Sequence, residues 1–266
     1  MFIKVVNIYI FLLHNQEVLS GIFLKTPIES LRKNNFNEAV KSDMFVDKTH
    51  FISEFFKQKF MLITAPKRFG KTVNLNMLKR FFEIQVHQNG TIIDREDTDN
   101  YKLFKDNNLN IMKNKSFVDV HFGRYPTVYF NFRGLNANTF REFIFDFKTM
   151  IGEVYSTTYF FFILAKGENN KRFLRGVDWN KFILYYDVSK VSNCHVYELV
   201  HSGGFLTEIM SRYFKRKVFV YINEIDSTIQ EGILKLGRHE AKIIAFIKKF
   251  MHILLNPTFV EKAYLS

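Results

Sequence analysis

The segment from residue 59 to about residue 84 constrains the fold more than any other part of the 266-residue chain. The apolar run KFMLITA predicts a short buried strand, and the loop PKRFGKT follows it directly. A helix from about residue 73 to 84 is then indicated by apolar residues at helical spacing, namely Leu75, Leu78, Phe81 and Phe82. A buried strand, a short loop and an amphipathic helix in this order are typical of an α/β domain with a parallel sheet.

The loop carries the residue types that hold a phosphate group. Backbone N–H groups at a helix N-terminus can point at phosphate oxygens, and glycine allows the tight curl that this requires. Lys71 would reach the β- and γ-phosphates of a nucleotide, and Thr72 would ligate Mg²⁺. Ala65 stands where such a loop usually begins with glycine, so an ordinary strand-to-helix turn is the alternative. The predicted nucleotide-binding residues are Ala65, Pro66, Lys67, Arg68, Phe69, Gly70, Lys71 and Thr72.

A second motif, VFVYINEID, pairs an apolar strand at residues 218–222 with polar residues at its end. ATPases of this class need a carboxylate there to support Mg²⁺ and a second one to activate water. Asn223 stands in the first place and can hold a metal-bound water only weakly, because its amide carries no charge. Glu224 is the predicted general base, and Asp226 is a further candidate for the metal site. The alternative is that these residues cap the next helix.

The rest of the chain alternates between strands and helices. The pattern predicts a strand at about 127–132, helices at about 140–154, 204–214 and 240–255, and the start of a fourth strand within FVEKAYLS. Residues 155–201 are expected to be helical with loops, and residues 88–115 to be polar and rich in turns. Asp47 or Thr49 is expected to cap a helix that begins near Phe51.

Composition limits the compartment and the partners. A single cysteine, Cys194, leaves no partner for a disulfide and favours an intracellular location, in the cytoplasm or nucleus. The apolar residues 2–13 are too few to span a membrane as a helix, and no clear cleavage site follows, so secretion is not expected. The net charge of +12 is compatible with nucleic acid as a partner but does not require it, since a biased composition gives the same charge.

Four spaced motifs resemble the predicted AAA-ATPase-like family, whose members often continue into a restriction-nuclease-like domain. They are FVDKT from Phe45, APKRFGKT from Ala65, YPTVYFNF from Tyr125 and VYINEID from Val220. The resemblance covers residues 28–266 as one domain and leaves residues 1–27 as an N-terminal extension. In this family the loop lacks the opening glycine, so Ala65 is ordinary. The departures from the family pattern are Lys67 in place of Arg and Asn131 and Asn223 in place of Asp.

The resemblance implies an α/β P-loop NTPase of the AAA/ASCE type, with a mostly parallel sheet flanked by helices and with ATP and Mg²⁺ as ligands. In that type an extra strand lies between the two nucleotide-binding strands, and the long segment between Lys71 and Asn223 leaves room for it. The family's fourth strand carries a polar sensor residue, and this chain stops within VEKAYLS. We therefore expect a C-terminally incomplete domain without the sensor. Its open sheet edge would invite self-association or a partner protein.

Three functions follow from these motifs. The first is ATP binding by a Walker A-type loop, with hydrolysis weak or lost because Asn223 degrades the Walker B motif. The second is an active Mg²⁺-dependent ATPase with Glu224 as the base. The third is a basic protein associated with nucleic acid.

Overall fold

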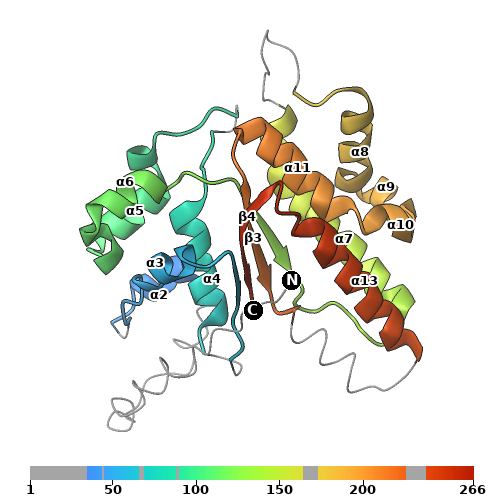
Figure 1. Cartoon of the computed structure of the whole chain (residues 1–266), viewed down its shortest axis with the longest axis horizontal. Coiled ribbons are helices and arrows are strands. Elements are labelled where there is room, and N and C mark those ends of the chain that lie inside the picture. Colours follow the sequence, from blue (N-terminus) through green and yellow to red (C-terminus); the bar gives the residue numbers. More distant parts are fainter. Residues whose placement is uncertain (1–34, 44, 66–68, 88–89, 164–172, 226–237) are drawn as a thin grey trace.

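The computed structural model describes residues 35–43, 45–65, 69–87, 90–163, 173–225 and 238–266. Its centre is a parallel sheet of four strands: β1 (Phe60–Leu62), β2 (Thr127–Asn131), β3 (Val218–Asn223) and β4 (Val260–Leu265). Helices cover both faces of this sheet, as Figure 1 shows. The predicted α/β architecture with a parallel sheet between helical layers is confirmed.

The strand order is β1-β4-β3-β2, so an extra strand does lie between the strand before the phosphate loop and the strand that ends in Asn223. That strand is β4, whose Ala263 pairs with Phe60 of β1 on one side and with Val220 of β3 on the other. The expectation that it comes from the segment between Lys71 and Asn223 is wrong. The strand in that segment, β2, lies at the edge of the sheet and pairs with β3.

The fourth strand expected within FVEKAYLS is present as β4. β4 extends over six residues and is buried along most of its length. Its backbone pairs with both neighbours, and Ser266 continues the pairing because its N–H donates to the carbonyl of Ile222 at 3.0 Å.

One helical layer is formed by α2 (Phe36–Val40), α3 (Phe51–Phe56), α4 (Lys71–Phe82), α5 (Asp99–Asp106) and α6 (Lys115–His121), with two short 3₁₀ turns, η2 (Arg95–Asp97) and η3 (Asn110–Lys113). Phenylalanine rings fill the space under the sheet: the ring of Phe82 lies 5.0 Å from that of Phe219 and 5.9 Å from that of Phe55. The prediction of polar, turn-rich sequence at 88–115 is wrong over α5, because Leu103 and Phe104 are buried in this core.

The FVDKT motif does not cap α3. The N-cap residue is His50, which makes no side-chain cap. Instead, an Asp47 carboxylate oxygen accepts the N–H of Asn110 at 2.6 Å, and the Thr49 hydroxyl accepts the N–H of Ile111 at 3.0 Å. The two side chains thus join the segment before α3 to η3, which lies about 60 residues further along the chain.

The other layer contains α7 (Phe140–Ile163), α8 (Gly176–Tyr186), α9 (Val188–Asn193), α10 (Val196–Leu199), α11 (Ser202–Phe214) and α13 (Arg238–Leu254), which confirms the helices predicted there. α11 and α13 pack closely, because a Cβ on Gly204 would lie 2.6 Å from the Ile253 side chain and 3.0 Å from its carbonyl oxygen. No helix within the described ranges is both long and apolar enough to cross a membrane. The predicted N-terminal extension, residues 1–27, lies outside the described residues.

Candidate functional site

The phosphate-loop candidate lies between β1 and α4. Gly70 is the N-cap of α4 in the left-handed conformation, with φ 79° and ψ 13°, which glycine adopts at little cost. Ala65 is partly buried near the end of β1, and the Phe69 side chain is 51% exposed. Three of the predicted loop residues, Pro66, Lys67 and Arg68, lie outside the described residues. The described part of the loop therefore turns sharply into a helix N-terminus, whose first N–H groups have no acceptor within the helix.

The first turn of α4 is joined directly to the end of β3. The Thr72 hydroxyl donates to the side-chain oxygen of Asn223 at 3.2 Å, across 151 positions of sequence. Asn223 is 2% exposed, and its amide nitrogen donates to the side-chain oxygen of Asn131 at 3.1 Å. The same Asn223 oxygen accepts the hydroxyl of Ser266 at 3.3 Å. Four polar side chains, from α4 and from the ends of β2, β3 and β4, thus form one hydrogen-bonded cluster.

Ser266 is a residue of this cluster that the sequence analysis did not identify. The side chain that follows β4 is polar, fully buried and bound to Asn223. The signal for it was present in the sequence, because Ser266 ends the apolar strand AYL just as Asn223 ends VFVYI. Since the carboxyl ends of parallel strands meet at one edge of a sheet, a polar residue at each strand end identifies this cluster.

Glu224 lies beside the cluster rather than in it. It follows β3 in the left-handed conformation, with φ 56°, and its side chain is 30% exposed. The nearest cation described is Arg133, whose Nε lies 3.9 Å from the carboxylate. Asp226, the other predicted acid, lies outside the described residues.

Tyr129 and Arg133, which the sequence did not identify as site residues, share the surroundings of Glu224. Burial, reinforced by the negative charge of Glu224, raises the pKa of Tyr129 to about 12, although a hydrogen bond with Asn223 acts in the opposite direction. The phenol is therefore neutral at physiological pH and can serve only as a hydrogen-bonding group. Tyr129 lies within the YPTVYFNF motif, but the motif assigned it no role; Arg133 lies two residues after β2, which pairs with β3.

The donor atoms available for Mg²⁺ are neutral in the described part of the site. Thr72 offers a hydroxyl and Asn223 an amide oxygen, which are ligand types that Mg²⁺ accepts. Within the described ranges no three His, Cys, Asp or Glu side chains gather closely enough to hold a metal ion. The residues present therefore fit a weakly held cation, because carboxylates provide the charge that such sites usually need.

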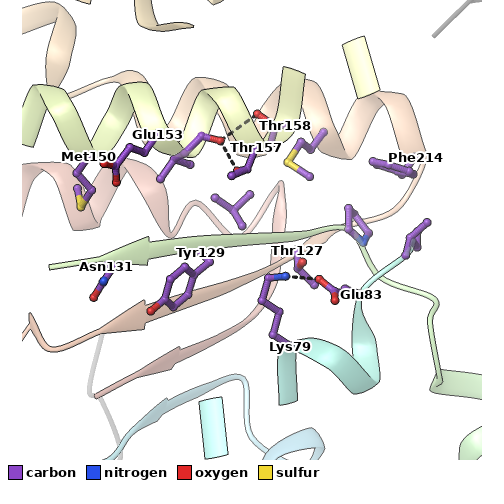
Figure 2. A pocket seen from close by; sticks show the side chains of 15 residues that line it. Lys79, Glu83, Thr127, Tyr129, Asn131, Met150, Glu153, Thr157, Thr158 and Phe214 are labelled. Carbon is purple, nitrogen blue, oxygen red and sulfur yellow. Dashed lines mark hydrogen bonds and ion pairs between the residues drawn. The ribbon is translucent and has the colours of Figure 1, made fainter. Parts of the chain in front are cut away.

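A separate groove of about 430 Å³ follows the open edge of β2 between α4 and α7 (Figure 2). Tyr129 and Asn131 line it near the carboxyl end of β2, and the ion pair between Lys79 and Glu83 lies on its α4 side. None of the described loop residues lines this groove, so it is distinct from the phosphate loop.

Comparison with curated proteins and with solved structures gives no match to this chain. The sequence model of a family described as "Predicted AAA-ATPase" matches residues 33–265, which is most of the chain and includes both the loop and the strand end described above. The chain belongs to the predicted AAA-ATPase family.

Proposed function

We propose that this protein binds ATP at the loop between β1 and α4 and hydrolyses it slowly or not at all. One observation carries the proposal: the helix that begins at Gly70 has its Thr72 hydroxyl bound to Asn223 at the end of β3. A helix N-terminus favours anions, Lys71 adds a positive charge at its first residue, and Thr72 lies one residue further on. These are the groups that a protein needs to bind the phosphates of a nucleoside triphosphate.

Mg²⁺, if bound, would supply positive charge to the phosphates, with Thr72 as a ligand and Asn223 holding the ion through a water. Asp226 is a further candidate from the sequence. Asn223 contributes no negative charge, and its amide is already hydrogen-bonded through both heteroatoms. The cation is therefore held less firmly, and the transition state for hydrolysis is stabilised less than it would be beside a carboxylate.

An active ATPase remains the competing function, and Glu224 is the residue that favours it. Its carboxylate is adjacent to Asn223 and 30% exposed, so a water molecule can reach it. Against this, the same carboxylate lies 3.9 Å from Nε of Arg133, so an attacking water would have to share it with an ion-pair partner.

Binding and turnover of Mg-ATP separate these functions when they are measured on the wild type, Lys71→Ala and Asn223→Asp. We expect Lys71→Ala to weaken ATP binding at least about tenfold, whereas Lys190→Ala, a control at an exposed lysine of α9, leaves it unchanged. Wild-type turnover should stay below about 1 s⁻¹ and rise in Asn223→Asp. Turnover at or above that rate in the wild type contradicts slow hydrolysis, and normal ATP binding by Lys71→Ala contradicts the loop assignment.

A further inference from the structure

The amino ends of the strands, at the opposite end of the sheet from the phosphate loop, carry a dense group of cations. We call this group the basic face. It consists of Lys59, Arg124, Lys215, Arg216, Lys217 and Lys262. Lys59 directly precedes β1, Arg124 lies in the loop before β2, and Lys217 directly precedes β3. Because all four strands are parallel, these positions meet at one edge of the sheet.

Hydrogen bonds to the backbone hold these cations together. Arg216 donates from Nη1 to the carbonyl of Arg124 at 2.9 Å, and Lys217 donates from Nζ to the carbonyl of Pro257 in the loop before β4 at 2.8 Å. On the other side, the carbonyl of Lys59 accepts the N–H of Ala263 in β4 at 3.0 Å. The loops before all four strands are thus linked, and the cations form one surface rather than scattered charges.

Five cations of this face, unlike Arg212 and Lys57 elsewhere, have no acidic partner among the described residues. Arg212 pairs with Asp178 at 3.0 Å, and Lys57 pairs with Glu54 at 2.7 Å. No carboxylate of the described residues lies within 4 Å of the charged groups of Lys59, Arg124, Arg216, Lys217 or Lys262. No ion pair among the described residues therefore neutralises these five charges.

The local potential is positive. His121 lies at this edge, and its pKa is lowered first by burial and then by the charges of Arg216 and Lys262. Lys262 is 8% exposed and lies 4.5 Å from the ring centroid of Phe56, while the other five cations are exposed to solvent. Glu261 is the acid that acts on Lys262 in the opposite direction. One carboxylate does not neutralise the face.

We propose that the basic face binds the phosphodiester backbone of nucleic acid. Neighbouring strands lie about 4.8 Å apart, so the cations extend over roughly 15 Å, which is enough to contact several successive phosphates. The Tyr125 ring lies under Arg216 at 5.0 Å and is only 9% exposed, so it offers no surface for base stacking. The contacts are therefore to phosphates, and binding does not depend on base sequence.

A lipid surface fits this face less well than nucleic acid does. The described loops before the four strands expose no large apolar side chain that could enter a bilayer.

Binding at this edge is also independent of the ATP proposal, because the phosphate loop and the basic face lie at opposite ends of the strands. The two proposals can fail separately.

The test is fluorescence anisotropy of a labelled 24-base-pair DNA duplex of mixed sequence, titrated at 50–300 mM KCl without nucleotide. We expect the logarithm of the association constant to fall with the logarithm of salt with a slope of about −3 or steeper. The variant Lys59→Ser/Arg124→Ser/Lys217→Ser should bind at least about tenfold more weakly, with the slope reduced by about 2 to 3.

The matched control, Lys190→Ser/Lys242→Ser/Lys248→Ser, removes three exposed lysines from α9 and α13 and so changes the net charge equally. It should bind DNA like the wild type. Equal losses in both triple variants, or no loss in the first, would overturn the proposal, as would binding to phosphatidylserine vesicles without binding to DNA. Circular dichroism checks that each variant is folded, and the single change Lys59→Ser, at an exposed side chain, gives the same test if the triple variant does not fold.

Discussion

Replacing Gly70 by alanine should separate nucleotide binding from stability. Gly70 has φ 79°, and a Cβ on it would meet no atom of the described residues within 4 Å, so the change causes no clash with them. Its cost is the left-handed backbone, about 1–2 kcal/mol for a residue with a side chain. For a domain of this size, each 1 kcal/mol corresponds to a melting temperature about 2–4 °C lower. The added methyl group enters the open space beside the loop, where phosphates must approach the backbone, so we expect ATP to bind at least about tenfold more weakly.

The control is Gly176→Ala. Gly176 begins α8 and has φ 52°. A Cβ on it would likewise meet none of the described atoms within 4 Å, but Gly176 lies away from the loop. The melting temperature of Gly176→Ala should therefore fall by a similar amount as that of Gly70→Ala, while its ATP affinity stays equal to that of the wild type. The assays are thermal unfolding followed by circular dichroism and titration calorimetry with Mg-ATP. If Gly70→Ala binds ATP as tightly as Gly176→Ala does, the space beside Gly70 is not where phosphate binds, and the reasoning is refuted.

Three further predictions concern the fold and are checked by urea unfolding. Gly204→Ala should lower the free energy of unfolding by about 1–3 kcal/mol, because its Cβ would lie 2.6 Å from a side chain of α13. A free energy of unfolding equal to that of the wild type would show that α11 and α13 can move apart at no cost. Tyr221→Phe should be neutral or stabilising, because its buried hydroxyl has no partner among the described residues, whereas Tyr155→Phe should cost about 1 kcal/mol, because its hydroxyl donates to a backbone carbonyl at 2.8 Å. Burial lowers the pKa of His121 and His201 in the folded state, so the unfolded chain takes up protons first as the pH falls through 6.5. The free energy of unfolding should therefore decrease from pH 7.5 to 5.5. This decrease should be smaller when both residues are changed to Gln.

The sequence predicted the elements whose pattern is local and did not predict their arrangement. Buried parallel strands are continuous apolar runs, so β2 and β3 were found within one residue of their ends. α5 was missed because it is short and only Leu103 and Phe104 mark its buried face among charged residues. The strand between β1 and β3 was expected from the segment between Lys71 and Asn223, whereas β4 occupies that place. The reason is that no local pattern encodes the order of strands in a sheet.

The site was predicted in part for the same reason. Thr72 and Asn223 belong to motifs with known chemistry, and the structure joins them at 3.2 Å. Tyr129 and Ser266 are brought to the site by the sheet, because Tyr129 lies on β2 and Ser266 directly follows β4, and both strands pair with β3. A rule based on strand ends finds Ser266, whereas Tyr129 lies two residues before the end of its strand and is found only from its contacts.

Asn131 and Asn223 are best understood as a coupled pair rather than as two independent replacements of a carboxylate. The resemblance given in the sequence analysis implies aspartate at both positions, and here the amide of Asn223 donates to the side-chain oxygen of Asn131 at 3.1 Å. Two carboxylates at that distance would repel each other in this partly buried site, whereas one carboxylate can accept a hydrogen bond from the remaining amide. In the absence of divalent cations, we therefore expect Asn131→Asp and Asn223→Asp to destabilise the protein more together than the sum of the single changes, by about 1–3 kcal/mol. Urea unfolding of the four proteins in EDTA measures this coupling, and repeating it with Mg²⁺ should reduce the coupling, because a cation offsets the repulsion. Additive free energies in EDTA would show that the two substitutions are independent.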